Sequence, residues 1–222
     1  MYPRYVPTGF GVGFDPATGT VGNSLTDNTW FDAAGNVIKQ QPAGSDLFTK
    51  TTYDSLGRST TRYSGYDLDE TSYADAGTVT GDTIMEQVES TYDDASNAIQ
   101  STTRNRYHNA AASQTGELKN PSETPNARVT YSASYPDALG RMVATANYGT
   151  NGGTALTRSS TVPTRSDTIS VTSTQFDSSG NMEDSTDPSA VVTRFEYDAV
   201  ARETKRILNY VTGSSSSGSG IS

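Results

Sequence analysis

Apolar and polar residues alternate on both sides of one short segment, YPDALGR at 135–141. Before and after it, every second position carries an apolar side chain: Val129, Tyr131, Ala133 and Tyr135, then Met142, Ala144, Ala146 and Tyr148. A period of two places such side chains on one face of a strand. The pattern therefore predicts two β-strands that share a buried face and are joined by a turn.

The segment at this turn recurs along the chain as an aromatic residue, Asp, a small residue and then Asn or Arg. Its copies are FDAAGN (31–36), YDSLGR (53–58), YDDASN (92–97), YPDALGR (135–141), FDSSGN (176–181) and YDAVAR (197–202). The aromatic residues are separated by 22, 39, 43, 41 and 21 positions. These intervals lie near one or two units of about 21 residues, and such a period indicates an array. Weaker copies are FDPATG (14–19) and YADAG (73–77).

Each residue of the repeat has a physical role in a hairpin turn. The aromatic residue ends a strand, the Asp carboxylate accepts backbone N–H groups, and glycine supplies a positive φ. The turn residues are Phe31, Asp32, Gly35, Asn36, Tyr53, Asp54, Gly57, Arg58, Tyr92, Asp93, Asn97, Tyr135, Asp137, Gly140, Arg141, Phe176, Asp177, Gly180, Asn181, Tyr197, Asp198 and Arg202. We expect Asp54, Asp93 and Asp177 to cap turn backbone, and Gly57 and Gly140 to have positive φ.

Three turns depart from this pattern. Ser96 and Ala201 replace the glycine, and a side chain in the left-handed region costs about 1–2 kcal/mol, so another geometry is expected there. Pro136 is expected to lengthen the turn that contains it. The NGG sequence at 151–153 is itself a hairpin signal.

One turn in about 21 residues leaves room for two strands of about seven residues and a return connection. The sequence therefore predicts an all-β protein, an array of antiparallel β-hairpins in an open, curved or spiralling sheet. The array is expected at 14–210, after a flexible N-terminal segment at 1–13 and before a Ser/Gly-rich linker or tail at 211–222. At most about 20 strands of about 4.8 Å each would be too few to close around a cargo.

The composition favours a thin core. Leu, Ile, Val and Phe make up 34 of 222 residues, about 15%, which is below the roughly 20% expected of a well-packed domain. The 33 threonines and 13 tyrosines suit a half-buried pleated surface, and the net charge of −9 is modest.

Charge and residue usage exclude several classes of function. An excess of 25 acidic over 16 basic side chains repels phosphate backbones and argues against nucleic-acid binding. No apolar run reaches the ~20 residues of a membrane span, and MYPRYVPTGFGVGFD lacks the apolar core of a secretory signal. The absence of cysteine excludes disulfides, thiolate nucleophiles and Cys-ligated zinc.

Catalytic and metal-binding patterns are weak. The only histidine, His108, is expected at a solvated loop or strand end. The carboxylate pairs Asp93–Asp94 and Asp67–Asp69 have no nucleophile beside them, so turn and surface roles are expected. DSSGN and DDASN lack the ligand spacing of a calcium loop, and GFGVGF (9–14) lacks the helix of a phosphate site. We therefore expect no catalytic residue, metal or cofactor.

The YDxxGR consensus at a spacing near 20 resembles the YD repeat of Rhs proteins, teneurins and the cocoon-forming subunits of toxin complexes. The resemblance covers roughly 14–208 and rests on six copies. It implies an antiparallel sheet that spirals into a shell, often around a toxic C-terminal domain, and the repeats are also linked to carbohydrate binding. The self-cleaving core segment of Rhs proteins is not found, so activities that depend on it are not expected.

Two functions follow from these patterns. One is a structural wall segment without catalytic activity, whose partners are other YD repeats of a parent chain or further copies at its sheet edges. The other is a carbohydrate- or cell-surface-binding module in which exposed aromatics, among them Trp30, stack on sugars. The orientation of Tyr53, Tyr92, Tyr135 and Tyr197 distinguishes them. The resemblance implies an extracellular or cell-surface location as part of an exported protein.

Overall fold

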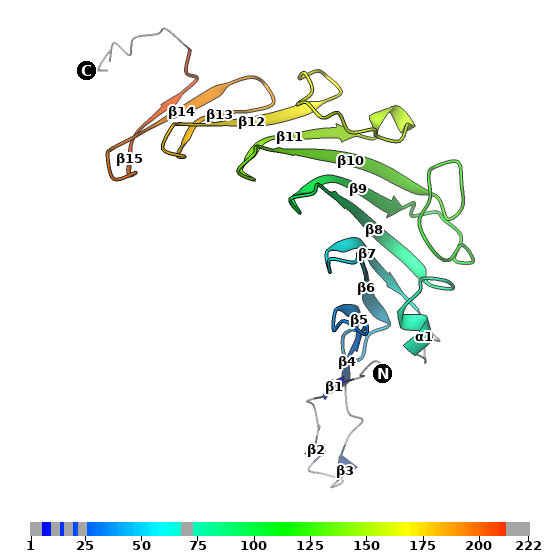
Figure 1. Ribbon diagram of the computed structural model, residues 1–222. Helices are drawn as coiled ribbons and strands as arrows, with labels where there is room; N and C mark the ends of the chain where they lie inside the picture. Colours follow the sequence, from blue (N-terminus) through cyan, green and yellow to red (C-terminus); the bar gives the residue numbers. More distant parts are fainter. Residues whose placement is uncertain (1–5, 10–13, 16–19, 22–25, 68–72, 212–222) are drawn as a thin grey trace. The chain divides into compact units, whose positions relative to one another are not determined.

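The computed structural model describes residues 6–9, 14–15, 20–21, 26–67 and 73–211 (Figure 1). Within these residues the chain is all-β, with one short helix α1 (Tyr73–Ala76) and one 3-10 turn η1 (Asn151–Gly153). The strands are β1 (Val6–Gly9), β2 (Phe14–Asp15), β3 (Thr20–Val21), β4 (Thr26–Phe31), β5 (Val37–Gln41), β6 (Leu47–Tyr53), β7 (Ser59–Tyr66), β8 (Thr83–Tyr92), β9 (Ala98–Arg106), β10 (Ala127–Pro136), β11 (Met142–Gly149), β12 (Ser170–Phe176), β13 (Met182–Thr186), β14 (Val192–Tyr197) and β15 (Glu203–Leu208).

Thirteen of the described strands form one sheet in the order β1-β4-β5-β6-β7-β8-β9-β10-β11-β12-β13-β14-β15, and β2 pairs with β3 alone. From β4 onward this order is the order in the chain, as hairpin connectivity requires. The order begins at β1 and ends at β15, so the sheet is open. An open array of antiparallel hairpins is confirmed.

All six repeat turns join an even-numbered strand to the strand that follows it, as β4 to β5 and β14 to β15. The register slips by one residue at the aromatic of four of these hairpins: Trp30/Phe31, Thr52/Tyr53, Gln175/Phe176 and Glu196/Tyr197. A slip at this place is typical of a three-residue loop in which a left-handed residue forms a bulge.

The other connections leave the opposite ends of the strands. Two are short, at 42–46 and 187–191, and three are long, at 67–82, 107–126 and 150–169. The sequence patterns in two of the long connections were misread. YADAG (73–77) forms helix α1 and the bend after it rather than a repeat turn, and NGG (151–153) forms η1 at the start of a long connection rather than a tight hairpin.

The chain divides into two compact units. Unit 1 holds the described residues of 1–91, 101–131 and 152–154, and unit 2 holds those of 92–100, 132–151 and 155–222. Within the predicted N-terminal segment 1–13, Val6–Gly9 form β1 and pair with β4. The rest of that segment, the turn of FDPATG and residues 212–222 lie outside the described residues.

Unit 1 has an apolar cluster on one face of its strands. Its buried members are Phe48, Tyr63, Ile84, Leu118 and Ala127, with Val79 packed against them. Leu118 comes from the long connection at 107–126, and its N–H donates to the side-chain amide oxygen Oε1 of Gln87 at 2.8 Å. This connection therefore completes the core that the strands begin.

In unit 2, buried positions alternate along β10 and β11 as expected. The described buried residues of this unit include Ala133, Tyr135, Ala144, Ala146, Tyr148 and Val171. In the adjoining part of β10, Val129 and Tyr131 are also buried, whereas Met142 is 39% exposed. The predicted buried face is confirmed except at Met142, which directly follows the turn.

Candidate functional site: the repeated turns

The six repeat turns share one backbone geometry. The N–H of each Asp donates to the C=O of the residue four positions later at 2.8–3.0 Å. The N–H of the residue three positions after the Asp donates to the Asp C=O at 2.9–3.1 Å. The Asp residues are Asp32, Asp54, Asp93, Asp137, Asp177 and Asp198. Local sequence sets this geometry, because every bond lies within five residues.

The Asp side chain caps the same turn. At Asp54, Oδ1 accepts the N–H groups of Leu56 at 2.9 Å and Arg58 at 3.0 Å. Asp177 accepts the N–H groups of Ser179 and Asn181 in the same way. The cap at Asp93 includes the N–H of Asn97 at 2.8 Å. The predicted capping role of these carboxylates is confirmed.

The last residue of the repeat pairs with the second carboxylate oxygen. In three turns Oδ2 accepts the side-chain amide of Asn36, Asn97 or Asn181 at 2.9–3.0 Å. In the other three it accepts Nε of Arg58, Arg141 or Arg202 at 2.7–2.8 Å. Asn and Arg are interchangeable here because both present an N–H donor to the carboxylate.

These bonds favour the ionised carboxylate. The side-chain amide of Asn97 is the largest cause that holds the pKa of Asp93 below its usual value, and Asn181 lowers the pKa of Asp177 likewise. The backbone N–H of Arg202 lowers the pKa of Asp198. At Asp137, burial raises the pKa, but the bonds from Arg141 and the turn backbone outweigh it, and the pKa is lowered.

The residue before Asn or Arg adopts a left-handed conformation in every repeat turn. Gly57 has φ 76° and Gly140 has φ 77°, as predicted. The expectation of another geometry at Ser96 and Ala201 is wrong, because they have φ 67° and 61° and keep the same backbone bonds. The bonds made by the turn therefore compensate for the cost of a Cβ in this region.

Pro136 does not lengthen its turn. Asp137 pairs with Arg141 as the other Asp residues pair, and Pro136 takes the position that the aromatic holds elsewhere. Tyr135 is shifted back by one residue and belongs to the buried face of β10, where it is 3% exposed. The repeat aromatic has thus become a core residue here.

A further turn of the same kind was missed in the sequence. In DPSAV at 187–191, Asp187 N–H donates to Val191 C=O at 3.0 Å, and Ala190 has φ 65°. Its Oδ1 accepts the Val191 N–H at 2.9 Å. The turn lacks both the aromatic and the glycine of the repeat, and only Asp-Pro marks it.

Successive turns are bonded to each other. In unit 1, the Tyr53 hydroxyl donates to the C=O of Val37, the first residue after the preceding turn, at 2.8 Å. In unit 2, the Tyr197 hydroxyl donates in the same way to the C=O of Met182 at 3.0 Å. The aromatic residue therefore ties its own hairpin to the one before it.

The last residue of one turn also contacts the next turn. The Arg141 guanidinium lies 4.2 Å from the centre of the Phe176 ring. A Cβ at Gly180 would lie 3.6 Å from Arg141 Nη1, and one at Gly140 would lie 3.4 Å from Asn97 Oδ1. We call this series of contacts between successive repeat turns the turn ladder.

The orientation of the tyrosines follows this arrangement. Tyr53 and Tyr197 are half-buried against the preceding hairpin, and Tyr92 is also half-buried. Tyr135 lies under the guanidinium of Arg158 at 4.5 Å and bonds to the Tyr148 hydroxyl at 3.1 Å. Burial, together with that bond, raises the pKa of Tyr135 to about 12. Tyr53, Tyr135 and Tyr197 are therefore each bonded to another strand of the sheet.

Trp30, the predicted sugar-stacking residue, has Lys39 over its ring at 4.7 Å from Nζ to the ring centre. Lys39 is 1% exposed, and its Nζ also lies 5.1 Å from the Phe48 ring. Next to it in the same cross-strand row, Lys50 bonds to Asp82 at 2.7 Å, with both side chains buried. Sequence reasoning missed this buried ion pair, because its partners are 32 residues apart.

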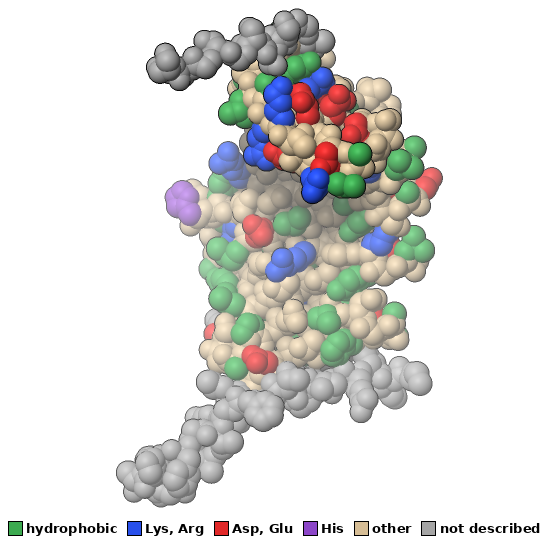
Figure 2. Space-filling view, turned by 90° about the vertical axis from the view of Figure 1, so that its left-hand side faces the viewer, with side chains coloured by type: hydrophobic (Ala, Val, Ile, Leu, Met, Phe, Trp, Pro, Cys, Tyr) green, Lys and Arg blue, Asp and Glu red, His purple; other side chains and the backbone are tan. Residues whose placement is uncertain are grey.

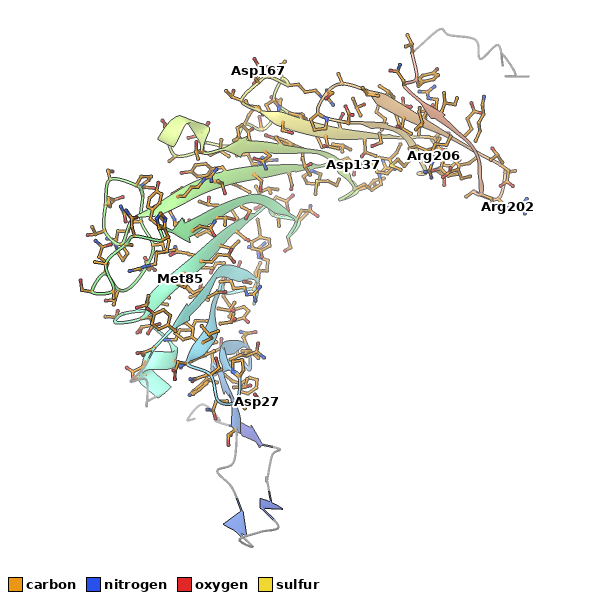
Figure 3. The ribbon with its side chains drawn as sticks, turned by 180° about the vertical axis from the view of Figure 1, so that it is seen from behind. Asp27, Met85, Asp137, Asp167, Arg202 and Arg206 are labelled. Atoms are coloured by element: carbon orange, nitrogen blue, oxygen red, sulfur yellow. The ribbon has the colours of Figure 1, made fainter. Side chains whose placement is uncertain are left out.

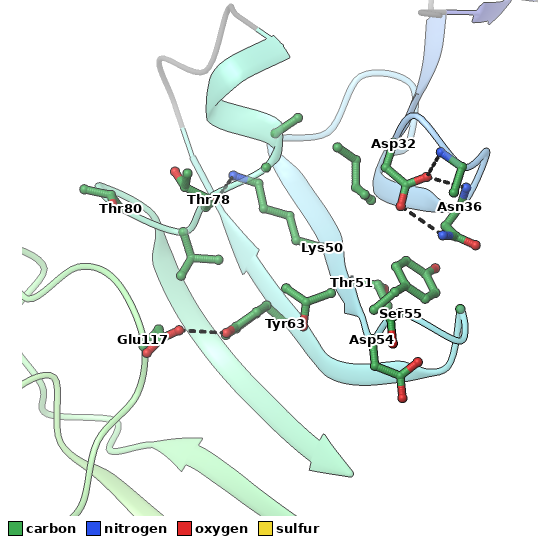
Figure 4. Close-up of a pocket in the computed structure, with 18 of the residues that line it drawn as sticks. Asp32, Asn36, Lys50, Thr51, Asp54, Ser55, Tyr63, Thr78, Thr80 and Glu117 are labelled. Atoms are coloured by element: carbon green, nitrogen blue, oxygen red, sulfur yellow. Dashed lines mark hydrogen bonds between the residues drawn. The ribbon is translucent and has the colours of Figure 1, made fainter. Parts of the chain in front are cut away.

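A groove of about 860 Å³ lies beside these residues in unit 1 (Figure 4). Its lining includes the turns at Asp32 and Asp54 together with Thr78, Val79 and Glu117. Tyr63 lines the groove, and its hydroxyl donates to Glu117 Oε1 at 3.0 Å. Tyr53 also lines it, so one repeat tyrosine reaches a concave surface.

The residues considered for catalysis or metal binding are dispersed. His108 is exposed and is the purple side chain of Figure 2. Asp93 belongs to its turn, Asp94 is exposed, and Asp69 lies outside the described residues. No group of three or more His, Asp or Glu residues in the described part of the chain is arranged to hold a metal ion. None of the described helices is long and apolar enough to span a membrane.

No family model matches this chain, and no curated protein matches it. Among solved structures, it is similar to a chain of TcdB2-TccC3 without its hypervariable C-terminal region, with 13% identity and a TM-score of 0.29, over 86% of this chain and 12% of that one. For TcdB2-TccC3-Cdc42 the identity is 11% and the TM-score 0.29, over 83% and 10%. Values this low support no argument about function, which has to rest on the turns themselves.

Proposed function

We propose that this chain is a structural YD-repeat segment of an Rhs-type β-shell or of a cell-surface or toxin-associated protein, without catalytic activity of its own. One observation carries the proposal: in the turn ladder, the side chains of the repeat bond within their own turn or to the neighbouring hairpin. The Asp carboxylate, the Asn or Arg side chain and, at Tyr53 and Tyr197, the aromatic hydroxyl all bond within a turn or to its neighbour.

Such an array grows by one hairpin for each repeat, and its stability is a sum of hairpin terms and nearest-neighbour terms. Its natural partners are further YD repeats of a parent chain or further copies of this chain, which pair with the strands at the ends of the sheet order, β1 and β15. A location outside the cell, as part of an exported protein, belongs to the same proposal.

The groove of unit 1 favours a second candidate, a carbohydrate- or surface-binding module. Tyr53 and Tyr63 line this groove together with polar residues such as Glu117. Against this candidate, the Tyr53 hydroxyl is already bonded to Val37, and Lys39 covers one face of Trp30. Packing explains the aromatic residues of the repeat more completely than ligand binding does.

The two functions predict different results for variants of Tyr53. A wall segment whose hydroxyl ties two hairpins should lose about 1 kcal/mol of unfolding free energy in Tyr53→Phe, because one hydrogen bond is lost. A wall segment should also bind no sugar when the natural chain is tested against a glycan microarray. Tyr107→Phe, in the connection after β9, is the control for a general effect of hydroxyl removal.

The opposite result is equally clear. Suppose that the natural chain binds a glycan, that Tyr53→Ala abolishes this binding, and that Tyr53→Phe unfolds like the natural chain. These results would contradict the wall function and support the binding module.

A further inference from the structure

Within the described residues, the last repeat turn lacks a ring contact that an earlier repeat turn makes. Arg141 pairs with Asp137 at 2.7 Å and also lies over the Phe176 ring of the next repeat turn. Arg202 pairs with Asp198 at the same distance of 2.7 Å. The Arg202 side chain is 78% exposed, against 34% for Arg141. Figure 3 shows Arg202 at the outer tip of the β14–β15 hairpin.

A backbone acceptor stands beside this arginine. The tyrosines of the turn ladder donate to the C=O of Val37 and Met182, each five residues after the Asp of the preceding turn. The equivalent residue after Asp198 is Glu203. Glu203 is the first residue of β15, the last strand in the order of the sheet.

The charges on β15 do not oppose a neighbouring strand. Lysine and arginine on an edge strand usually discourage pairing. Here Lys205 lies 3.5 Å from Glu196, and Arg206 lies 3.1 Å from Glu203. Both cations therefore have acidic partners within the β14–β15 hairpin.

We propose that Arg202 and the Glu203 carbonyl form a docking surface for the aromatic residue of a following Tyr-Asp turn, whose strand pairs with the outer edge of β15. The inference rests on the proposed wall function and names the contacts by which the wall continues. The ring stacks on the Arg202 guanidinium as Phe176 stacks on Arg141, and the hydroxyl donates to Glu203 C=O as Tyr197 donates to Met182. The fit is to a tyrosine, since phenylalanine would leave the carbonyl without this donor.

The chain itself supplies a matched probe. Asp177 and Asp198 are 21 residues apart, so a second copy of residues 187–207 inserted after Ile207 adds one repeat in the same phase. The copied β14 then stands where a strand would pair with β15, and the copied tyrosine faces Arg202. All residues of the natural chain remain in the extended chain.

The experiment measures hydrogen exchange of the β15 amides in the natural and extended chains, each with and without Arg202→Ala. The extension should protect amides of residues 203–207. Arg202→Ala should lower that protection roughly two- to fivefold in the extended chain, the fold-change of a surface cation–π contact, and should have no effect on the natural chain. Val200→Ala, an exposed residue of the same turn, is the control and should change neither chain.

The outcomes separate the two proposals. Protection of β15 that is indifferent to Arg202→Ala, or that falls equally in both chains, would overturn the docking surface and leave the wall intact. No added protection of β15 in the extended chain would contradict the wall itself. Replacing the copied tyrosine by phenylalanine should reproduce part of the loss of β15 protection. An unchanged exchange rate in this variant would show that the Glu203 carbonyl is not an acceptor for the tyrosine.

Discussion

Strands β6–β8 of unit 1 and β13–β15 of unit 2 are stabilised in different ways. The first group buries Phe48, Tyr63 and Ile84 in an apolar cluster that a long connection completes with Leu118. Among the residues of β13–β15, only Asp184 is buried. The sheet is continuous in its strand order, but the source of its stability changes along the chain.

In the second group, polar contacts replace the apolar cluster. Arg194 bonds to both carboxylate oxygens of Asp184 at 2.6 and 2.8 Å and lies over the Tyr210 ring at 4.2 Å. The hydrogen bonds that Arg194 donates to the Asp184 carboxylate are the largest cause that raises the pKa of Arg194. With little buried apolar surface, these short hairpins depend on their turns and on contacts between turns.

The largest expected effect is the loss of the buried ion pair in unit 1. Asp82→Ala removes the carboxylate partner of the buried Lys50, whose Nζ also donates to the C=O groups of Asp75 and Thr78. The variant should cost about 3–5 kcal/mol of unfolding free energy, measured with urea. Asp184→Ala in unit 2 removes a pair whose arginine is 24% exposed, and should cost about 1 kcal/mol.

A double variant separates the charge from the space it occupies. Lys50→Met with Asp82→Leu should recover most of the stability that Asp82→Ala loses, because no unpaired charge remains in the core. Equal losses for Asp82→Ala and Asp184→Ala would mean that the two regions do not differ as described.

The second effect concerns the left-handed position of the turn, where the two regions carry different residues. Gly57→Ala in unit 1 should lower the unfolding free energy by about 1 kcal/mol, and Ala201→Gly in unit 2 should raise it by about as much. Glycine lacks the Cβ that disfavours positive φ. Apart from the two chain neighbours, the nearest described atom to a Cβ at Gly57 is Asn36 Oδ1 at 3.8 Å, so the cost is conformational.

Thermal or urea unfolding of each variant measures these changes. Gly77→Ala is the control, because Gly77 is not one of the glycines with positive φ and has room for a Cβ. A loss at Gly77 as large as that at Gly57 would argue against the conformational explanation.

A third effect is a loss of stability in acid. The pKa of the Asp in each of the six repeat turns, for example Asp93 and Asp177, is lower in the folded chain than the ordinary value. Such a group contributes its full stabilisation at pH values above the pKa of the unfolded chain, which is about 4 for Asp. This contribution is lost as the pH falls through the pKa of the folded chain.

Melting temperatures between about pH 7 and pH 3 measure this linkage. Asp177→Asn should melt at a lower temperature than the natural chain at neutral pH and should lose less on acidification. Asp94→Asn, at an exposed neighbour of Asp93, is the control for the replacement of a surface carboxylate. An identical acid response in Asp177→Asn and the natural chain would exclude that turn as a source of the effect.

The sequence allowed the turns to be predicted because their bonds are local. Asp54, Leu56 and Arg58 interact within five residues, so their pattern carries most of the required information. The alternation around YPDALGR likewise predicted the buried face of β10 and β11, since a period of two depends only on the pleat.

Contacts between distant residues were not predictable in this way. The Lys50–Asp82 pair and the packing of Leu118 depend on how long connections fold onto the sheet. The turn at Asp187 was missed because it lacks the aromatic and the glycine, and the residues at 73–76 formed a helix although they resembled the repeat. Local motifs define hairpins, but the partners of a buried charge depend on tertiary structure.

The turn ladder is tested most directly by a double-mutant cycle between Arg141 and Phe176, which belong to successive repeat turns of unit 2. Unfolding free energies are measured for the natural chain, Arg141→Ala, Phe176→Leu and the double variant. The ladder predicts a coupling of about 0.5–1 kcal/mol between the two residues. Additive losses, with no coupling beyond error, would contradict the claim that the repeat residues bond one hairpin to the next.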